Sequence, residues 1–201
     1  MSRLLRTSEI TKLPVVTLAG EDVAQIKDIV FAGGGGEVGG FTLAGRGLFA
    51  GPLKQSLLWT SVLALGADAV MITDESALSE RDAVVDHSAS HGGSGGDVLG
   101  SRVLTDAGTD LGQVVDVVVE VGGGGSEQCD VVGYEIEASE ALAAAGKGAR
   151  GTKLFIPLPD TIAASGEHLM VPASAKDFVR DDLAGFGAAV VDFRKQLEAT
   201  R

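Results

Sequence analysis

The chain has 201 residues, of which 45% are hydrophobic and 22% are charged, and these proportions are typical of a folded, water-soluble protein. Its net charge of −12 disfavours direct binding to nucleic acid or to anionic lipid surfaces. The single cysteine, Cys129, excludes an internal disulfide, and no apolar run is long enough for a signal peptide or a membrane span. We therefore expect a cytoplasmic protein without a membrane span.

A stretch of fifteen residues occurs twice in the chain. Residues 17–31 return 88 positions later as residues 105–119, and seven of the fifteen positions are identical. A repeat of this length indicates two successive units of similar fold. We expect domains at 8–85 and 98–173, which are joined by a Gly/Ser-rich linker at 86–97 and followed by an amphipathic helix at 174–200.

The first repeat begins with a predicted β-hairpin. Residues 13–18 and 23–31 are rich in β-branched side chains, and Gly20 lies in the short turn between them. Residues 1–12 are interpreted as a polar lead-in, and a short helix is expected after Ser79, where Ser-Glu-Arg-Asp resembles a capping box. Further strands are expected at 37–46, 54–60 and 69–73.

The second repeat predicts the same order of strands. In its longest strand, at 110–121, the odd-numbered residues from Leu111 to Val121 are expected to share one face. Short strands with short connections predict a mainly β fold class, with two small antiparallel β-barrels in tandem and a C-terminal helix. The strands of the second repeat are expected at 100–105, 110–121, 129–138, 152–159 and 169–172.

The C-terminal region has the periodicity of a helix of about 25 residues. Ser174 and Asp177 form a predicted capping box at its start. The apolar stripe that follows packs either on its own domain or against a second copy or another protein, and the sequence leaves these alternatives open. The stripe consists of Val179, Leu183, Phe186, Val190, Phe193 and Leu197.

No group of residues predicts catalysis, a cofactor or a metal ion. Cys129 has no recognisable partner base, and the glycine loop at 33–36 lacks the lysine and the hydroxyl residue of a phosphate-binding loop. His87 and His91 lie four positions apart, but the surrounding Gly and Ser disfavour the helix that a zinc site with this spacing would need. We therefore expect no catalytic residues, no cofactor and no metal ligands.

The repeated stretch resembles the PRC-barrel family. In each copy, a hairpin turn with Gly leads into a strand of the type Gly-x-Val-x-Asp-Val-Val, here residues 24–30 and 112–118, although Ala24 replaces the first glycine. A variable loop follows, then a strand with a Gly-aromatic pair, then a strand that ends in a turn with Trp or Pro. The resemblance covers residues 8–75 and 96–173 and implies two PRC-type β-barrels.

The resemblance implies a binding or assembly module, because members of the family are generally adaptors rather than enzymes. We expect a non-enzymatic adaptor for a protein partner of unknown identity, which forms a homodimer through its C-terminal helix. The alternative is an accessory factor in RNA processing or ribosome maturation that binds a basic ribosomal protein. An enzyme or small-ligand binder would need convergent polar groups. Candidate partner contacts are Leu48, Phe49 and Leu53, together with the helix stripe.

Overall fold

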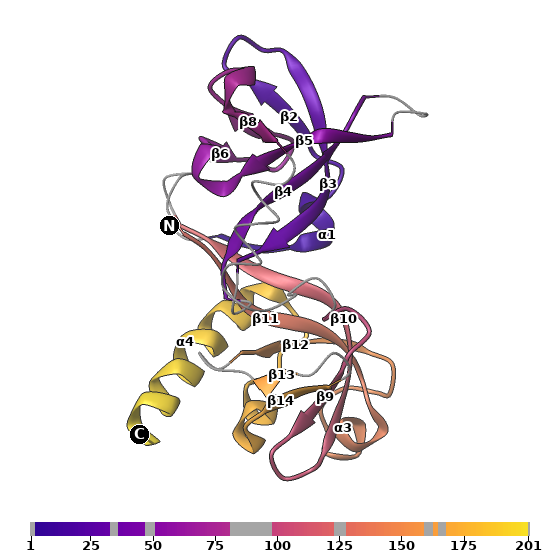
Figure 1. The fold of residues 1–201 in the computed structure, drawn as a ribbon. Helices are drawn as coiled ribbons and strands as arrows, with labels where there is room; N and C mark the ends of the chain where they lie inside the picture. Colours follow the sequence, from indigo (N-terminus) through magenta and orange to yellow (C-terminus); the bar gives the residue numbers. More distant parts are fainter. Residues whose placement is uncertain are drawn as a thin grey trace. The chain divides into compact units, whose positions relative to one another are not determined.

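The computed structural model describes residues 3–32, 36–46, 51–80, 98–122, 128–158, 163–164 and 168–200. The chain is mainly β with a C-terminal helix, and it divides into two compact units (Figure 1). The first unit comprises residues 1–96 and 119–131, and the second comprises residues 97–118 and 132–201. Residues 119–131 therefore belong with the first unit, in contrast to the linear division expected from the repeat.

The first unit is built on a seven-stranded sheet of order β6-β7-β2-β3-β4-β5-β8. The pairs are antiparallel except that β2 runs parallel to β7, because the chain crosses over between them. The pairing of the described strands ends at β6 and β8, so the closed antiparallel barrel is corrected to an open, mixed sheet. The strands are β2 (Pro14–Thr17), β3 (Asp22–Phe31), β4 (Val38–Ala44), β5 (Pro52–Leu58), β6 (Ala64–Leu65), β7 (Val70–Ile72) and β8 (Leu78–Glu80).

The core of the first unit is mainly aliphatic. Strand alternation places Val15 and Thr17 of β2 inside the unit and leaves Val16 half-exposed. Trp59 begins the 3-10 helix η1 (Trp59–Ser61), and its ring lies edge-on to Phe41 at 6.1 Å between centroids. The predicted fourth strand thus ends two residues earlier than expected, because Trp59 turns inward.

Residues 3–12 are ordered, which corrects the predicted lead-in. Strand β1 (Arg3–Arg6) leads into the short helix α1 (Thr7–Ile10). The carboxylate of Glu9 accepts a hydrogen bond from the Arg6 N–H at 2.8 Å, and Leu5 and Ile10 are buried. The two buried residues, Leu5 and Ile10, anchor the segment, but two positions are too few to give a visible periodicity in the sequence.

The second unit repeats the topology of the first. Its strands follow the order β12-β11-β10-β9-β14-β13, and β9 runs parallel to β14 as β2 does to β7. The predicted bounds of β10 (Asp110–Val121) and β11 (Cys129–Ala138) are confirmed. The other elements are β9 (Arg102–Thr105), α3 (Glu140–Ala144), β12 (Lys153–Pro157), β13 (Ala163–Ala164) and β14 (His168–Val171).

The predicted face of β10 is wrong at its start. Gln113 is exposed whereas Val114 is buried, because the register shifts between Asp110 and Gly112. Such a bulge reverses the alternation of the side chains that follow it.

The far end of the β10–β11 hairpin completes the first unit. Asp130 forms an antiparallel bridge with Glu37, and the Val131 N–H donates to the Gly36 carbonyl at 2.8 Å. Val119 and Cys129 of the same hairpin end are buried. A segment of the second repeat is therefore part of the first unit.

The helix predicted at 174–200 is interrupted. Residues 173–178 form the 3-10 helix η4 (Ala173–Phe178), Arg180 pairs with Phe155 as a β-bridge, and α4 (Leu183–Thr200) begins only afterwards (Figure 1). The N-cap is Asp182, whose carboxylate accepts from the Gly185 N–H at 2.7 Å. The periodicity alone did not reveal the break, because Val179 continues the apolar spacing in an extended conformation.

The predicted N-cap at Ser79 is corrected, and residues 81–86 of the helix predicted after it lie outside the described residues. Ser79 pairs with Ser56 in the β5–β8 ladder, so it lies in a strand rather than at an N-cap. Arg180 occupies the corresponding place beside β12 in the second unit. The linker at 86–97, with His87 and His91, lies outside the described residues.

Candidate protein-binding surfaces

The two repeats form the same hairpin turn. In the first unit, the Thr17 N–H donates to the Glu21 carbonyl at 2.8 Å, and the Thr17 hydroxyl accepts from the Glu21 N–H at 3.1 Å. In the second unit, Thr105 and Thr109 make the same two bonds at 2.9 and 3.0 Å. The equivalence at an offset of 88 residues is therefore structural as well as sequential.

The equivalence extends along the following strand. The side-chain amide of Gln25 donates to the Lys12 carbonyl at 2.7 Å, and that of Gln113 donates to the Gly100 carbonyl at 2.8 Å. The two acceptor residues share a left-handed conformation, with φ of 74° at Lys12 and 85° at Gly100. In each unit, the equivalent glutamine thus holds the segment before the hairpin through a hydrogen bond to its backbone.

Gly20 and Gly108 occupy the left-handed position of the two turns, with φ of 84° and 77°. A Cβ at either position would meet no atom within 4 Å, so the cost of alanine there is conformational only. We expect Gly20→Ala and Gly108→Ala each to lower the free energy of unfolding by about 1–2 kcal/mol. Urea unfolding followed by circular dichroism would measure both. Costs that differ widely would contradict the equivalence of the turns.

The aspartates of the repeated strand differ in environment. Asp28 is exposed, accepts the Thr42 hydroxyl at 3.1 Å and pairs with Lys27 at 3.0 Å. Asp116 is buried, and its carboxylate accepts from the Val117 N–H at 2.8 Å. Asp28 and Asp116 thus each accept a hydrogen bond from a residue of their own unit.

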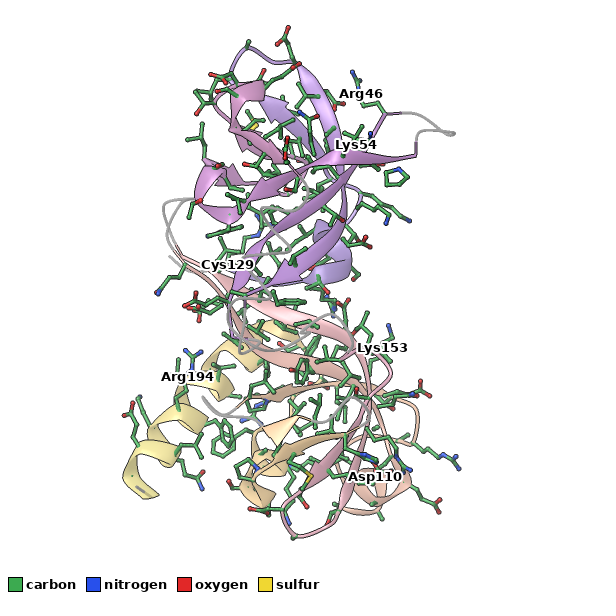
Figure 2. All side chains as sticks on the ribbon, viewed as in Figure 1. Arg46, Lys54, Asp110, Cys129, Lys153 and Arg194 are labelled. Carbon is green, nitrogen blue, oxygen red and sulfur yellow. The ribbon has the colours of Figure 1, made fainter. Side chains whose placement is uncertain are left out.

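An arginine neutralises the aspartate that starts the hairpin's second strand in each unit. Arg46 contacts the Asp22 carboxylate at 3.1 Å, and Arg102 contacts that of Asp110. Figure 2 labels Arg46 and Asp110. Asp22 and Asp110 are 88 residues apart, but their arginines come from different segments. Each unit therefore has its own Asp–Arg ion pair at the start of this strand, but the two arginines do not occupy equivalent positions of the repeat.

Cys129 lies buried in β11 (Figure 2), and burial, followed by the charge of Asp130, raises the pKa of its thiol from 9.0 to about 12. The thiol is therefore neutral at physiological pH. We expect it to react with a disulfide reagent at pH 8 about a hundredfold more slowly in the folded chain than in urea. Equal rates in the two states would contradict this burial.

The raised pKa of Cys129 also makes the stability of the fold depend on pH. Because the folded pKa lies above the unfolded value, folding favours the protonated thiol, and this contribution is lost as pH rises from 9 towards 12. Burial likewise raises the pKa of Tyr134 from 10.0 to about 12. The ionisation of Cys129 and of Tyr134 therefore affects stability only in the alkaline range.

The described residues contain no group of three or more His, Cys, Asp or Glu side chains that could hold a metal ion. In the same part of the chain, no helix is both long and apolar enough to cross a membrane.

The apolar stripe of the C-terminal region lies largely inside the second unit. Phe186 is 0% exposed, with its ring 5.5 Å from that of Phe155, and Phe193 is 0% exposed, 5.2 Å from the ring of Phe178. Val179 and Val190 are also buried, whereas Leu183 and Leu197 are half-buried. The stripe thus packs on its own unit, and α4 exposes Val191 instead.

The other predicted contacts are Leu48, Phe49 and Leu53. Leu53 lies in β5 and is half-exposed. Leu48 and Phe49 lie outside the described residues.

An apolar surface on the first unit was not predicted. Ala64 pairs with Met71, and Met71 pairs with Val16, so these three side chains lie in a row across β6, β7 and β2. Leu18, two positions after Val16, is 66% exposed, and Leu63 is 40% exposed. The N–H groups of Leu18 and Leu63 donate to the carbonyls of Ile72 and Met71, which places both residues beside β7. We call these five residues, Val16, Leu18, Leu63, Ala64 and Met71, the β7 face.

Exposed carboxylates flank the β7 face. Asp68 lies in the turn before β7, and Asp74 and Glu75 follow the end of that strand. Glu21 lies in the hairpin turn after Leu18. Hydrogen bonds from the Ser76 hydroxyl and N–H lower the pKa of Asp74, so this group is ionised at neutral pH. Residues 13–26 and 55–80 contain no Lys or Arg.

The corresponding surface of the second unit is different. Leu104 and Met170 pair as Val16 and Met71 do, but the position of Leu18 is occupied by Asp106. The carboxylate of Asp106 accepts from the Ala173 N–H at 2.9 Å and so holds the start of η4. Only the first unit therefore places an exposed leucine at this point of the turn.

The repeated hydrogen bonds, the crossover strand and the core describe a small β domain, and residues 3–78 match the model of the PRC-barrel domain. The first unit carries a PRC-barrel domain. The match begins with β1, before the boundary expected from the sequence at residue 8, and includes all of α1. No curated protein matches the chain.

Sequence reasoning missed the β7 face of the PRC-barrel domain because its residues come from three short strands. The pairing that joins Val16, Ala64 and Met71 is a tertiary property and leaves no periodic pattern. One signal was present: the copies of the repeat differ at Leu18 and Asp106, an apolar and a charged residue in turns that otherwise differ only at Glu21 and Thr109.

Proposed function

We propose that the chain is a non-enzymatic protein-interaction adaptor built from two PRC-type units. The observation that carries the proposal is the β7 face, an exposed apolar surface with carboxylates around it. Apolar patches bordered by polar residues are typical of protein-binding sites on soluble domains. The PRC-barrel domain would then supply a docking surface rather than a catalytic one.

The second unit is proposed to be a second PRC-type module. Three features that it has in common with the first unit support this proposal: the strand order, the parallel strand pair and the hydrogen bonds of the turn at Thr105 and Thr109. Its counterpart of the Leu18 position serves η4, so the two modules have different tasks. The first would bind the partner, whereas the second would carry the C-terminal helix.

Affinity capture with the full chain tests the adaptor proposal. Wild-type protein and the Leu18→Ser variant would be used as baits in parallel, with Met170→Ser as a control on an exposed apolar residue of the second unit. We expect a partner that the wild type and Met170→Ser retain and that Leu18→Ser loses, as measured by quantitative mass spectrometry. Equal recovery by all three baits would contradict binding through the β7 face.

A second candidate is an accessory role in RNA processing or ribosome maturation through a basic ribosomal protein. The carboxylates around the β7 face favour it, because they complement a basic protein surface. Sedimentation of cell extract through a density gradient tests this role. Comigration of the chain with ribosomal particles, and its loss at raised salt, would support the candidate.

Homodimerisation through the C-terminal helix and a cytoplasmic location remain part of the proposal. Because Phe186 and Phe193 are core residues, truncation before α4 would damage the second unit as well as any dimer. The exposed Val191 is the better site for a test. Light scattering after size exclusion should show a dimer for the wild type and a monomer for Val191→Asp, and a monomeric wild type would contradict the dimer.

A further inference from the structure

We propose that the β7 face binds a basic segment of a partner protein that carries apolar side chains. The inference rests on the proposed adaptor function and specifies the chemistry of the partner. It draws on two independent features of the surface: which side chains are exposed at its centre and which charges surround it.

The centre of the surface selects apolar side chains. Leu18 is 66% exposed and Leu63 is 40% exposed, while Val16 and Met71, which pair across β2 and β7, are half-exposed. Burial of these side chains against a partner removes apolar surface from water, which favours binding. Met71 at the middle of the row is unbranched and can adapt its shape to different apolar side chains.

The border of the surface selects positive charge. Asp68 lies at one end of β7, and Asp74 and Glu75 lie at the other, so a bound segment meets carboxylates at both ends. The nearby Asp22 is already paired with Arg46 and adds little. Since no Lys or Arg occurs at 13–26 or 55–80, these segments offer nothing that would attract an acidic partner.

The acidic border also disfavours a second copy of the chain as the occupant. Two identical β7 faces would bring their carboxylates together, and like charges across an interface oppose association. The net charge of −12 adds to that repulsion at long range. The apolar centre and the acidic border together favour a basic segment from another protein.

Fluorescence anisotropy with the full-length chain tests the proposal. The probe is a short labelled peptide of alternating Leu and Lys, with a Leu-Glu peptide and a Ser-Lys peptide as matched controls. We expect saturable binding of the Leu-Lys peptide that weakens with salt, and affinity at least about tenfold lower for either control.

Two pairs of substitutions separate the two features. Leu18→Ser with Met71→Ser removes the apolar centre, and Asp68→Lys with Glu75→Lys reverses the border. Each pair is expected to lower the affinity for the Leu-Lys peptide by about tenfold or more. The matched controls are Met170→Ser, at the register position equivalent to Met71, and Glu198→Lys on α4. Both should bind as the wild type does.

Three results would overturn the inference: binding that neither substituted pair reduces, equal binding of the Ser-Lys peptide, or a wild-type dimer that Leu18→Ser converts to monomer. The charge-reversed variant changes only exposed side chains, so its folding does not limit the test. Failure with the peptides but Leu18-dependent capture of a partner would refute the basic segment and leave the adaptor function intact. Failure of both would refute the two together.

Discussion

Replacement of Phe186 by Ala is expected to lower the free energy of unfolding of the second unit by about 3–5 kcal/mol. The side chain is 0% exposed and packs on Phe155, so its loss leaves a cavity in the core. Urea denaturation followed by circular dichroism gives the value. A loss of this size would identify Phe186 as a core residue, whereas the sequence suggested that it contacts a partner.

Val191→Ala is the matched control on the same helix. Val191 is 50% exposed, and its truncation should change stability by no more than about 0.5 kcal/mol. If Phe186→Ala proved as mild as Val191→Ala, α4 would not be packed on its own unit. The stripe would then be free for a partner.

Replacement of Gly133 or Gly40 by Ala is expected to have a comparably large effect, about 3 kcal/mol or more, because the added Cβ overlaps backbone. At Gly133 the Cβ would lie 2.3 Å from the Phe186 ring and 2.4 Å from the Ile156 carbonyl oxygen. At Gly40, where φ is 158°, it would lie 2.3 Å from the Leu57 carbonyl oxygen. Thermal unfolding of the two variants measures the loss in each unit.

Gly51→Ala provides the control for this pair. A Cβ at Gly51 meets no atom within 4 Å, and Gly51 does not have a positive φ, so the change should be nearly neutral. Wild-type stability of Gly40→Ala or Gly133→Ala would contradict the close approach of the paired strands. The Gly-aromatic pair of the repeat would then need another explanation.

The duplication made most of the strands predictable. β10 and β11 have the expected bounds, and the hairpin with Gly20 is present, because β-branched runs and a turn glycine act locally. The closed antiparallel barrel was not correct, because the parallel pairing of β2 with β7 depends on contacts distant in sequence. The predicted N-cap at Ser79 was wrong for a similar reason, since the pairing of Ser79 with Ser56 outweighs a local capping pattern.

The candidate surface was the least predictable feature. The spacing of Phe186 and Phe193 correctly indicated an apolar face but could not say what covers it. The exposure of Leu18 depends on where β7 lies beside the hairpin, and this is set by the crossover rather than by any motif. Comparison of the two copies was the one route to it, because Asp106 stands where Leu18 does.

The assignment of the interaction surface to the first unit is the central claim. Amide hydrogen exchange of the full chain, with and without the Leu-Lys peptide, tests it most directly. We expect slower exchange at residues 16–21 and 63–73 and no change at residues 104–109 and 168–171 of the second unit. Protection confined to the second unit, or no protection at a peptide concentration that saturates binding, would contradict it.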